Sequence, residues 1–277
     1  MDKNINKILL FGSTGMLGRY IYSYFKQYTS IEVIKVDFRI SIDSLELIEN
    51  VLVENNIDEQ TCIINCIGLI PQRKEATLSD KDYFLINGMF PHLLWNACKK
   101  YNAKMIQPTT DCVFSGKKGS YLETDCHDET NAYGMSKSLG EPQGCTVIRT
   151  SIIGLELFNK KSFMEWIISN NNKTINGWSN HMWNGITCLE YCKLVNHMIE
   201  NNKFWTGVRH IYSPTSKSKY ELAKIVNDVF DLNIKINSLE AEEVIDKTLL
   251  SIHKDSIFFA QELNIQISNL KLFNLLH

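Results

Sequence analysis

Apolar residues follow two alternating patterns over the first 150 residues of the chain. Short, nearly continuous apolar runs predict buried strands at residues 7–11, 31–37, 61–67, 104–108 and 145–149. Apolar residues at helical spacing between these runs predict helices at residues 15–27, 43–56, 79–102 and 131–141. Strands that are apolar on both faces and alternate with helices indicate a parallel sheet covered on both sides. The predicted fold class is therefore α/β, with a doubly wound parallel sheet.

This alternation becomes less regular in the second half of the chain. The later predicted helices lie near residues 162–169, 186–200 and 219–230. The later predicted strands lie at residues 208–212 and 233–238. We therefore expect a first lobe of residues 1–150 and a smaller second lobe of residues 151–277, from which some segments return to the first.

Composition and charge narrow the classes of function. The 29 basic and 31 acidic residues give a net charge of −2, which offers no electrostatic attraction for nucleic acid or an anionic membrane. No apolar run approaches the roughly 18 residues of a membrane span. The eight cysteines include no Cys-x-x-Cys pair, and no metal-ligand spacing is present. We expect a globular protein of the reducing cytoplasm, with neither nucleic acid nor membrane as a partner.

A glycine-rich turn follows the first predicted strand. Gly12, Gly15 and Gly18 form the pattern Gly-x-x-Gly-x-x-Gly between this strand and the first helix. The first glycine permits a tight turn, and the second lets the backbone approach a pyrophosphate at the helix N-terminus. The third permits close packing of the helix on the strand. The pattern predicts a Rossmann-type dinucleotide site.

The sequence leaves the identity of the dinucleotide open. Asp37 ends the second predicted strand, where a carboxylate bonds the adenosine ribose of NAD. Arg39 lies two residues further on, where a guanidinium meets the 2′-phosphate of NADP. The two residues therefore predict opposite cofactors.

A tyrosine and a lysine lie four residues apart on one predicted helix. Tyr133 and Lys137 share a face of this helix. A nearby cation favours the phenolate and lowers the pKa of a tyrosine, which then exchanges a proton with a carbonyl or alcohol oxygen. Thr109 and Thr110 follow the preceding strand, where a hydroxyl either bonds the same oxygen or caps a turn.

These motifs resemble the extended short-chain dehydrogenase/reductase family, and within it the dTDP-4-dehydrorhamnose reductases and related nucleotide-sugar 4-reductases. The matching stretches are residues 11–18, 64–68, 87, 109–116, 133–137, 140–141, 148–154 and 218–223. The most specific stretch is Thr-Asp-x-Val-Phe-x-Gly, found here at residues 110–116. It distinguishes this group from the sugar epimerases and dehydratases of the same superfamily.

The resemblance implies a role for each matching residue. Tyr133 would protonate the C4 oxygen of a 4-keto sugar, and Thr110 would bond the same oxygen. Lys137 would lower the pKa of the tyrosine and hold the nicotinamide ribose, while Asn87 would support the site from behind. Hydride would come from NADPH, with NADH as the alternative. The residues expected to bind the cofactor are Gly12, Ser13, Thr14, Gly15, Met16, Leu17, Asp37, Arg39, Cys66, Ile67, Gly68, Tyr133 and Lys137.

Cys112 departs from the rhamnose reductases, which commonly carry tyrosine at this position. The bifunctional plant-type 3,5-epimerase/4-reductases resemble this chain in having a cysteine there. A thiolate of near-neutral pKa would remove the acidic proton beside the C4 ketone, whereas a small buried cysteine would only pack. The sequence leaves both interpretations open.

Two tryptophans in the second lobe are candidates for substrate binding. The stretches 160–166 and 176–185 are similar to a subgroup from bacterial surface-polysaccharide loci that is thought to act on UDP-linked N-acetylated 6-deoxyhexosamines. Trp178 and Trp183 would then stack on a base or a sugar face, or they are ordinary core aromatics.

The sequence therefore predicts an NAD(P)H-dependent 4-reductase of a UDP-linked 4-keto-6-deoxyhexose with a 2-acetamido group. A 3-epimerase step at Cys112 is a second expected activity. The pathway would be nucleotide-sugar biosynthesis of the L-rhamnose, L-rhamnosamine or quinovosamine type. The alternatives are a dTDP-4-dehydrorhamnose reductase, an epimerase or dehydratase that retains NAD, and a non-catalytic NAD(P)-sensing module. The sequence leaves open whether the protein forms a homodimer.

Overall fold

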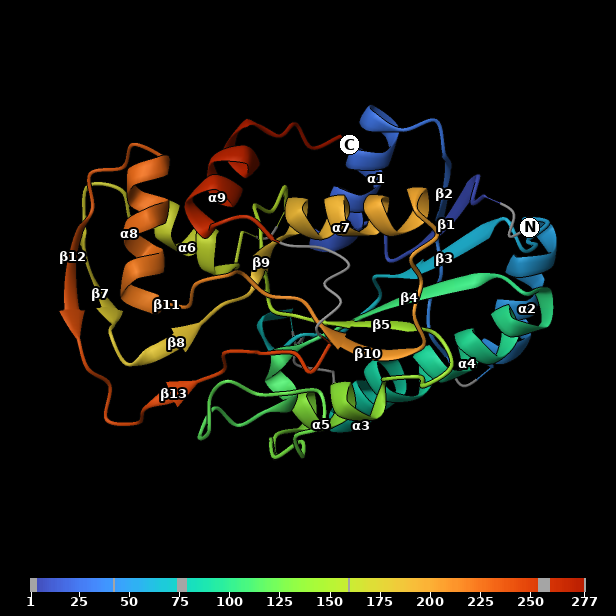
Figure 1. Ribbon diagram of the computed structural model, residues 1–277, viewed down its shortest axis with the longest axis horizontal. Helices are drawn as coiled ribbons and strands as arrows, with labels where there is room; N and C mark the ends of the chain where they lie inside the picture. Colours follow the sequence, from blue (N-terminus) through green and yellow to red (C-terminus); the bar gives the residue numbers. More distant parts are fainter. Residues whose placement is uncertain (1–3, 42, 74–78, 159, 254–259, 277) are drawn as a thin grey trace.

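The protein is represented by a computed structural model that describes residues 4–41, 43–73, 79–158, 160–253 and 260–276. Within these residues the centre is a six-stranded sheet with the order β10-β5-β4-β3-β1-β2 (Figure 1). Its strands are β1 (Lys7–Phe11), β2 (Glu32–Val36), β3 (Thr61–Asn65), β4 (Lys104–Thr109), β5 (Thr146–Arg149) and β10 (Gly207–His210). Every ladder in this sheet is parallel, which confirms the predicted α/β class.

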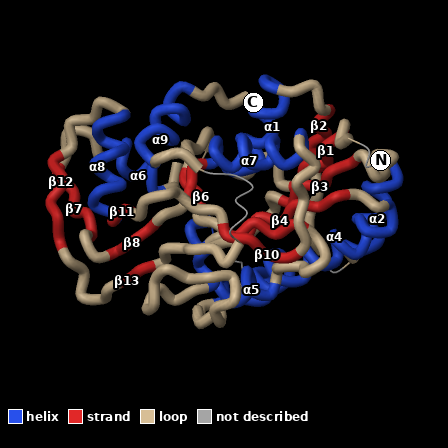
Figure 2. Tube along the Cα trace, in the orientation of Figure 1, coloured by secondary structure: helices blue, strands red, loops and turns tan. Residues whose placement is uncertain are grey.

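Helices cover both faces of the sheet (Figures 1 and 2). The helices that pack directly on it are α1 (Met16–Tyr28), α2 (Ser44–Glu54), α4 (Phe90–Cys98) and α7 (Cys188–Glu200). Successive strand residues point to opposite faces, so Ile8 and Leu10 enter the core with α1 and α7. Leu9 and Phe11 enter a second core with α2 and α4. All four side chains are fully buried, which explains why the strand is one continuous apolar run.

A smaller group of elements lies beside the sheet, at the end of the molecule where Figure 1 labels β7, β12 and α8. Its strands are β6 (Ile152–Ile153), β7 (Thr174–Trp178), β8 (His181–Trp183), β9 (Ile186–Thr187), β11 (Lys217–Ser218), β12 (Lys235–Leu239) and β13 (Ile245–Asp246). Its helices are α6 (Phe163–Ser169), α8 (Lys219–Val229) and α9 (Leu263–Leu272). Because β10 belongs to the central sheet, the chain enters this second group and returns. The boundary expected at residue 150 stays a prediction.

The helix predicted at residues 79–102 is divided in the structure. It consists of α3 (Asp80–Tyr83), a π-helical turn η2 (Phe84–Met89), α4 and a 3-10 turn η3 (Lys99–Tyr101). Pro91 lies in the first turn of α4 and has no N–H to offer the carbonyl of Asn87. The widened turn at Asn87 is the result, and such turns are frequent at functional sites.

A buried charged cluster connects the sheet to the loops at its carboxyl edge. Arg149, at the end of β5, is 1% exposed, and its Nε and Nη2 donate to the two carboxylate oxygens of Glu141 at 3.0 and 2.6 Å. Nη1 lies 2.8 Å from Nε2 of His210, and Nη2 lies 2.7 Å from Nε2 of His127. The guanidinium also lies over the ring of Phe114. The cluster therefore joins β5, β10 and the two loops that carry His127 and Phe114.

Both histidines of this cluster are held neutral. An imidazole nitrogen that faces a guanidinium must accept a hydrogen bond, so Nδ1 of His210 carries the proton and donates to the Leu250 carbonyl at 2.7 Å. Burial and the Arg149 charge lower the pKa of His210 to about 4, against the opposing influence of Glu123. The same two causes lower the pKa of His127.

This cluster makes the stability of the fold depend on pH. Between about pH 6.5 and the folded-state pKa of about 4, the unfolded chain binds a proton at His210 that the folded chain does not. The free energy of unfolding is therefore expected to fall as the pH decreases through this window. Urea titrations at several pH values measure this slope. His210→Gln, which keeps an acceptor and a donor but does not titrate, should show a flatter profile, and equal slopes in both proteins would contradict the assignment.

Candidate active site

The turn predicted to bind a dinucleotide lies where the strand order reverses. β2 lies on one side of β1, while β3, β4 and β5 lie on the other. Phe11 at the end of β1 is in register with Val36 of β2 and Asn65 of β3, so these three strands end together. Gly12 and Cys66, the next residues of β1 and β3, therefore meet at one edge. Ligands of α/β sheets bind in the crevice outside the carboxyl ends at such a reversal.

The three glycines of the turn differ in what surrounds them. Gly12 has a φ of +73°, and a Cβ there would lie 2.6 Å from the backbone of Cys66. A Cβ on Gly18 would lie 2.2 Å from the carbonyl oxygen of Gly12. A Cβ on Gly15 would meet nothing closer than 3.4 Å, and Gly15 begins α1 without any side-chain cap. Gly12 and Gly18 therefore shape the turn, while Gly15 at the helix N-terminus would accept a Cβ at ordinary van der Waals distance.

The other residues expected to bind the cofactor surround this edge. Leu17 is buried in the core. The remaining residues of that set keep exposed surface: Ser13, Thr14, Met16, Asp37, Arg39, Cys66, Ile67, Gly68, Tyr133 and Lys137. Asp37 and Arg39 are both exposed just after β2, so each stays a prediction for its cofactor.

Alanine substitutions separate the two kinds of glycine. Gly18→Ala is expected to lower the free energy of unfolding by about 1–3 kcal/mol, because its Cβ overlaps the Gly12 carbonyl. Gly15→Ala should keep the stability of the wild type, because its Cβ meets only ordinary contacts, but weaken binding of a dinucleotide, because the methyl group would separate the backbone from the pyrophosphate. Urea unfolding and a binding titration measure the two effects. The division of roles is wrong if both variants lose stability equally.

The helix α5 (Ala132–Leu139) is fixed in place by the side chain of Asn87. The Asn87 amide accepts from the Leu69 N–H and donates to the Leu69 carbonyl, both at 2.9 Å. It also donates to the Ser136 hydroxyl at 3.2 Å. A Cβ on Gly140, at the end of α5, would lie 1.8 Å from the Asn87 carbonyl oxygen. The Asn87 side chain thus joins the π-helical turn to the loop after β3 and to α5. The end of α5 also lies directly against the backbone of this turn.

Lys137 lies against the loop that follows β3. A Cβ on Gly68 would lie 2.9 Å from its ammonium nitrogen, so the end of the lysine side chain approaches this loop closely. Burial lowers the pKa of Lys137 to about 8, while the neighbouring Cys66 and Glu141 act in the opposite direction. The side chain is therefore still mainly charged near pH 7.

Tyr133, on the same helix α5 as Lys137, lies beside Thr110. Its ring packs edge-on against Tyr83 at 6.2 Å between centroids. Burial and the neighbouring Cys112 raise the pKa of Tyr133, and a hydrogen bond with Thr110 opposes this rise only in part. The lowered tyrosine pKa expected from the sequence is therefore wrong for this arrangement. A protonated phenol is what a proton donor to a carbonyl oxygen requires.

Thr110 and Cys112 belong to the short turn η4 (Asp111–Val113) that follows β4. The Thr110 hydroxyl accepts from the Cys112 N–H at 3.1 Å and donates to the Asp111 carboxylate at 2.9 Å. Thr110 thus caps the turn and faces Tyr133 as well. Burial and Asp111 raise the pKa of Cys112 to about 12. Of the two interpretations that the sequence leaves open for Cys112, this environment favours the uncharged, packed thiol over a near-neutral one.

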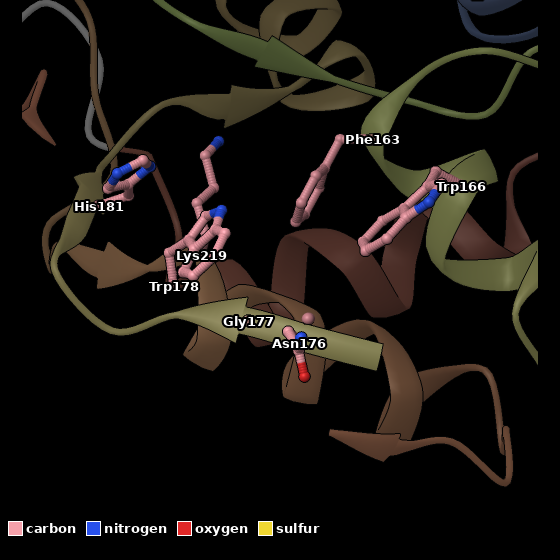
Figure 3. Close-up of a pocket in the computed structure, with 8 residues that line it drawn as sticks. Phe163, Trp166, Asn176, Gly177, Trp178, His181 and Lys219 are labelled. Carbon is pink, nitrogen blue, oxygen red and sulfur yellow. The ribbon is translucent and has the colours of Figure 1, made fainter. Parts of the chain in front are cut away.

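An aromatic pocket of about 270 Å³ lies in the smaller group of elements. Figure 3 shows Phe163 and Trp166 from α6 on one side of it, facing Trp178 at the end of β7 and Lys219 on the other side. Trp178 is 39% exposed and lines the pocket, in agreement with an exposed stacking surface. Trp183 is 3% exposed and lies in the core, so the expectation that it stacks on a substrate is corrected.

The pocket residues Phe163, Trp166 and Lys219 were not among the candidates from the sequence. Phe163 and Trp166 lie three residues apart on a helix, which places both side chains on one face. Ser218 and Glu221 form a capping box, which fixes Lys219 in the first turn of α8. Such spacings indicate which residues share a face of one helix. They do not indicate that α6 and α8 meet around a pocket.

Within the described parts of the chain, no group of three or more His, Cys, Asp or Glu residues is arranged to hold a metal ion. No described helix has both the length and the apolar character needed to cross a bilayer.

The parallel sheet, the glycine turn and the Tyr133–Lys137 pair together define a short-chain dehydrogenase/reductase type of fold and site. The sequence matches the family described as RmlD substrate binding domain over residues 6–248. The chain therefore belongs to this family, which confirms the resemblance found in the sequence.

Solved structures of low identity share the fold. A dTDP-4-dehydrorhamnose reductase from Bacillus anthracis in complex with NADP is 17% identical, with a TM-score of 0.79 and coverage of 98% of this chain and 99% of that one. The corresponding reductase from Yersinia enterocolitica is 21% identical, with a TM-score of 0.75 and coverage of 96% and 98%. A UDP-N-acetylglucosamine 4-epimerase from Methanobrevibacter ruminantium, in complex with UDP-N-acetylmuramic acid, is 16% identical, with a TM-score of 0.72 and coverage of 98% of each chain. No curated protein matches the sequence significantly.

These matches bear on the function expected from the sequence. The family and several of the solved structures favour the dTDP-4-dehydrorhamnose reductase, which was the alternative, over the UDP-linked acetamido sugar. They do not support an epimerase step.

Proposed function

We propose that the protein is a reductase that uses NADPH to convert the C4 ketone of a nucleotide-linked 4-keto-6-deoxyhexose to an alcohol. dTDP-4-dehydrorhamnose is the first candidate substrate, because the family match and the reductase structures point to it. The observation that carries the proposal is the contact of α5 with the turn after β4, where a Cβ on Gly134 would lie 2.4 Å from the Cys112 carbonyl oxygen, which brings Tyr133 beside Thr110. Lys137 and the glycine turn lie at the same edge.

The residues at the strand reversal fit a dinucleotide. Gly15, at the N-terminus of α1 without a side-chain cap, lets the backbone approach a pyrophosphate, which the backbone N–H groups would bind. Arg39 is available for a 2′-phosphate and Asp37 for a ribose, and the NADP bound to the Bacillus anthracis reductase favours the first. When bound, a reduced nicotinamide supplies a hydride.

The protein's own contribution to reduction is a proton and its placement. As C4 gains a hydride, its oxygen gains one proton, which Tyr133 donates. Because the pKa of Tyr133 is raised, the phenol is protonated at neutral pH and loses its proton only to the developing alkoxide. Thr110 would donate a second hydrogen bond to the same oxygen when its single O–H turns from the Asp111 carboxylate to the substrate. The charged Lys137, buried nearby, favours negative charge developing on the oxygens of the site.

The aromatic pocket is the proposed place of the nucleotide base. Trp178 offers an exposed ring, and Phe163 and Trp166 lie across from it. Such surfaces stack on the flat face of a base. A UDP-linked 2-acetamido sugar remains the second candidate substrate. A 3-epimerase step at Cys112 remains a prediction that the raised pKa of its thiol disfavours.

The reaction is tested by NADPH oxidation with a panel of dTDP- and UDP-linked 4-keto-6-deoxy sugars. Tyr133→Phe removes the donated proton and keeps the ring that packs on Tyr83. It is expected to lower kcat by about 10²- to 10⁴-fold while leaving NADPH binding almost unchanged. Absorbance at 340 nm and a fluorescence titration with NADPH measure the two quantities.

A matched control for this variant is Tyr220→Phe, which removes a hydroxyl from a tyrosine of α8 and should leave kcat unchanged. Running the reaction in heavy water adds a test of the epimerase step, since exchange at C3 would place deuterium in the product. The reductase proposal fails if no 4-keto sugar consumes NADPH, or if Tyr133→Phe keeps full activity.

A further inference from the structure

Lys219 is a cation that the described protein leaves without an ionic partner. It is the first residue of α8 and lines the aromatic pocket. Its ammonium lies 4.8 Å from the ring centre of Phe163 and 5.3 Å from that of Trp183. Within the parts of the chain that the structure describes, no carboxylate forms an ion pair with it and no acceptor forms a hydrogen bond.

This environment is costly for a lone ammonium. The side chain is partly buried, and burial lowers its pKa. A charge taken out of water requires a partner, and ring faces compensate only part of the lost hydration. The carboxylate of Asp111 acts on it from beyond ion-pair distance. The site therefore lacks an anion, which a ligand would supply.

The position of Lys219 indicates which anion fits. On one side its neighbours Asp111 and Cys112 belong to the turn that begins at the catalytic Thr110. On the other side it forms a wall of the pocket opposite Phe163 and Trp166 (Figure 3). A nucleotide sugar has the same order of parts, with a base at one end, a sugar at the other and a diphosphate between them.

We propose that Lys219 binds the diphosphate of the nucleotide sugar, and that this contact places the sugar at Tyr133 when the base occupies the aromatic pocket. The proposal deepens the proposed function and rests on it. An ammonium binds phosphate oxygens as a compact charge with three N–H donors. Lys219 would therefore distinguish diphosphate-linked sugars from free sugars, and it touches the substrate far from the reacting carbon.

The test measures how much each phosphate adds to binding. Thymidine, dTMP and dTDP are titrated by calorimetry in the presence of saturating NADP⁺, which occupies the dinucleotide turn. Lys219→Met keeps an unbranched apolar chain but removes the ammonium that lies over Phe163 and Trp183. It is expected to weaken dTDP binding by about 10- to 100-fold, the value of a hydrogen bond to a charged group, and to leave thymidine binding unchanged. Lys219→Arg should retain most of the affinity for dTDP.

Lys224→Met is the matched control. Lys224 lies on the same helix, is exposed and has its ammonium over the ring of Tyr220, outside the pocket lining. Its replacement should leave all three affinities unchanged. In kinetics with the 4-keto sugar nucleotide, Lys219→Met should raise KM by a similar factor and change kcat much less.

A second measurement uses the wild-type chain and does not depend on a variant that folds. Lysines are acetylated with limiting acetic anhydride, with and without dTDP, and the modified peptides are quantified by mass spectrometry. dTDP should protect Lys219 several-fold and leave Lys224 unprotected. Equal dTDP affinity in the wild type and Lys219→Met, or no protection of Lys219, overturns the proposal even if the protein reduces 4-keto sugars. If dTDP binds at Lys219 but no reduction that depends on Tyr133 is observed, the proposed reaction is overturned instead.

Discussion

The close contact between α5 and the π-helical turn at Asn87 is the constraint on which the site depends. Pro91 cannot donate the α-helical hydrogen bond to the Asn87 carbonyl, and Gly140 lets the end of α5 approach that carbonyl. The Asn87 amide then ties this pair to the loop after β3. Any side chain at Gly140 would move the helix that carries Tyr133 and Lys137. Backbone contact at this distance sets the catalytic geometry more firmly than side-chain packing alone.

Burial then determines the protonation states that the chemistry uses. It raises the pKa of Tyr133 and Cys112, and it lowers the pKa of Lys137 to about 8. Near neutral pH the site therefore presents a protonated phenol, a charged ammonium and an uncharged thiol. That combination suits delivery of a proton to a carbonyl oxygen. It does not suit removal of a proton from carbon by Cys112, which would require a thiolate.

The sequence was sufficient for the sheet, the glycine turn and the catalytic pair, because each depends on residues close together in the chain. Apolar runs gave β1 to β5 within a few residues of their observed bounds. The short strands β7 and β8 and the helix α9 were not predicted, since polar residues interrupt their apolar pattern. The pKa of Cys112 and the isolated charge of Lys219 depend on burial by distant segments. No local spacing carries that information.

The central claim is that hydride and proton meet at C4 of a nucleotide-linked sugar, with Tyr133 as the proton donor. The most direct measurement is a single turnover with NADPH deuterated at the transferable position of its nicotinamide, followed by NMR of the sugar product. The account predicts one deuterium, bonded to C4, in the wild-type product, and no labelled product from Tyr133→Phe on the same timescale. Deuterium at another carbon, or a product formed without label, would contradict it.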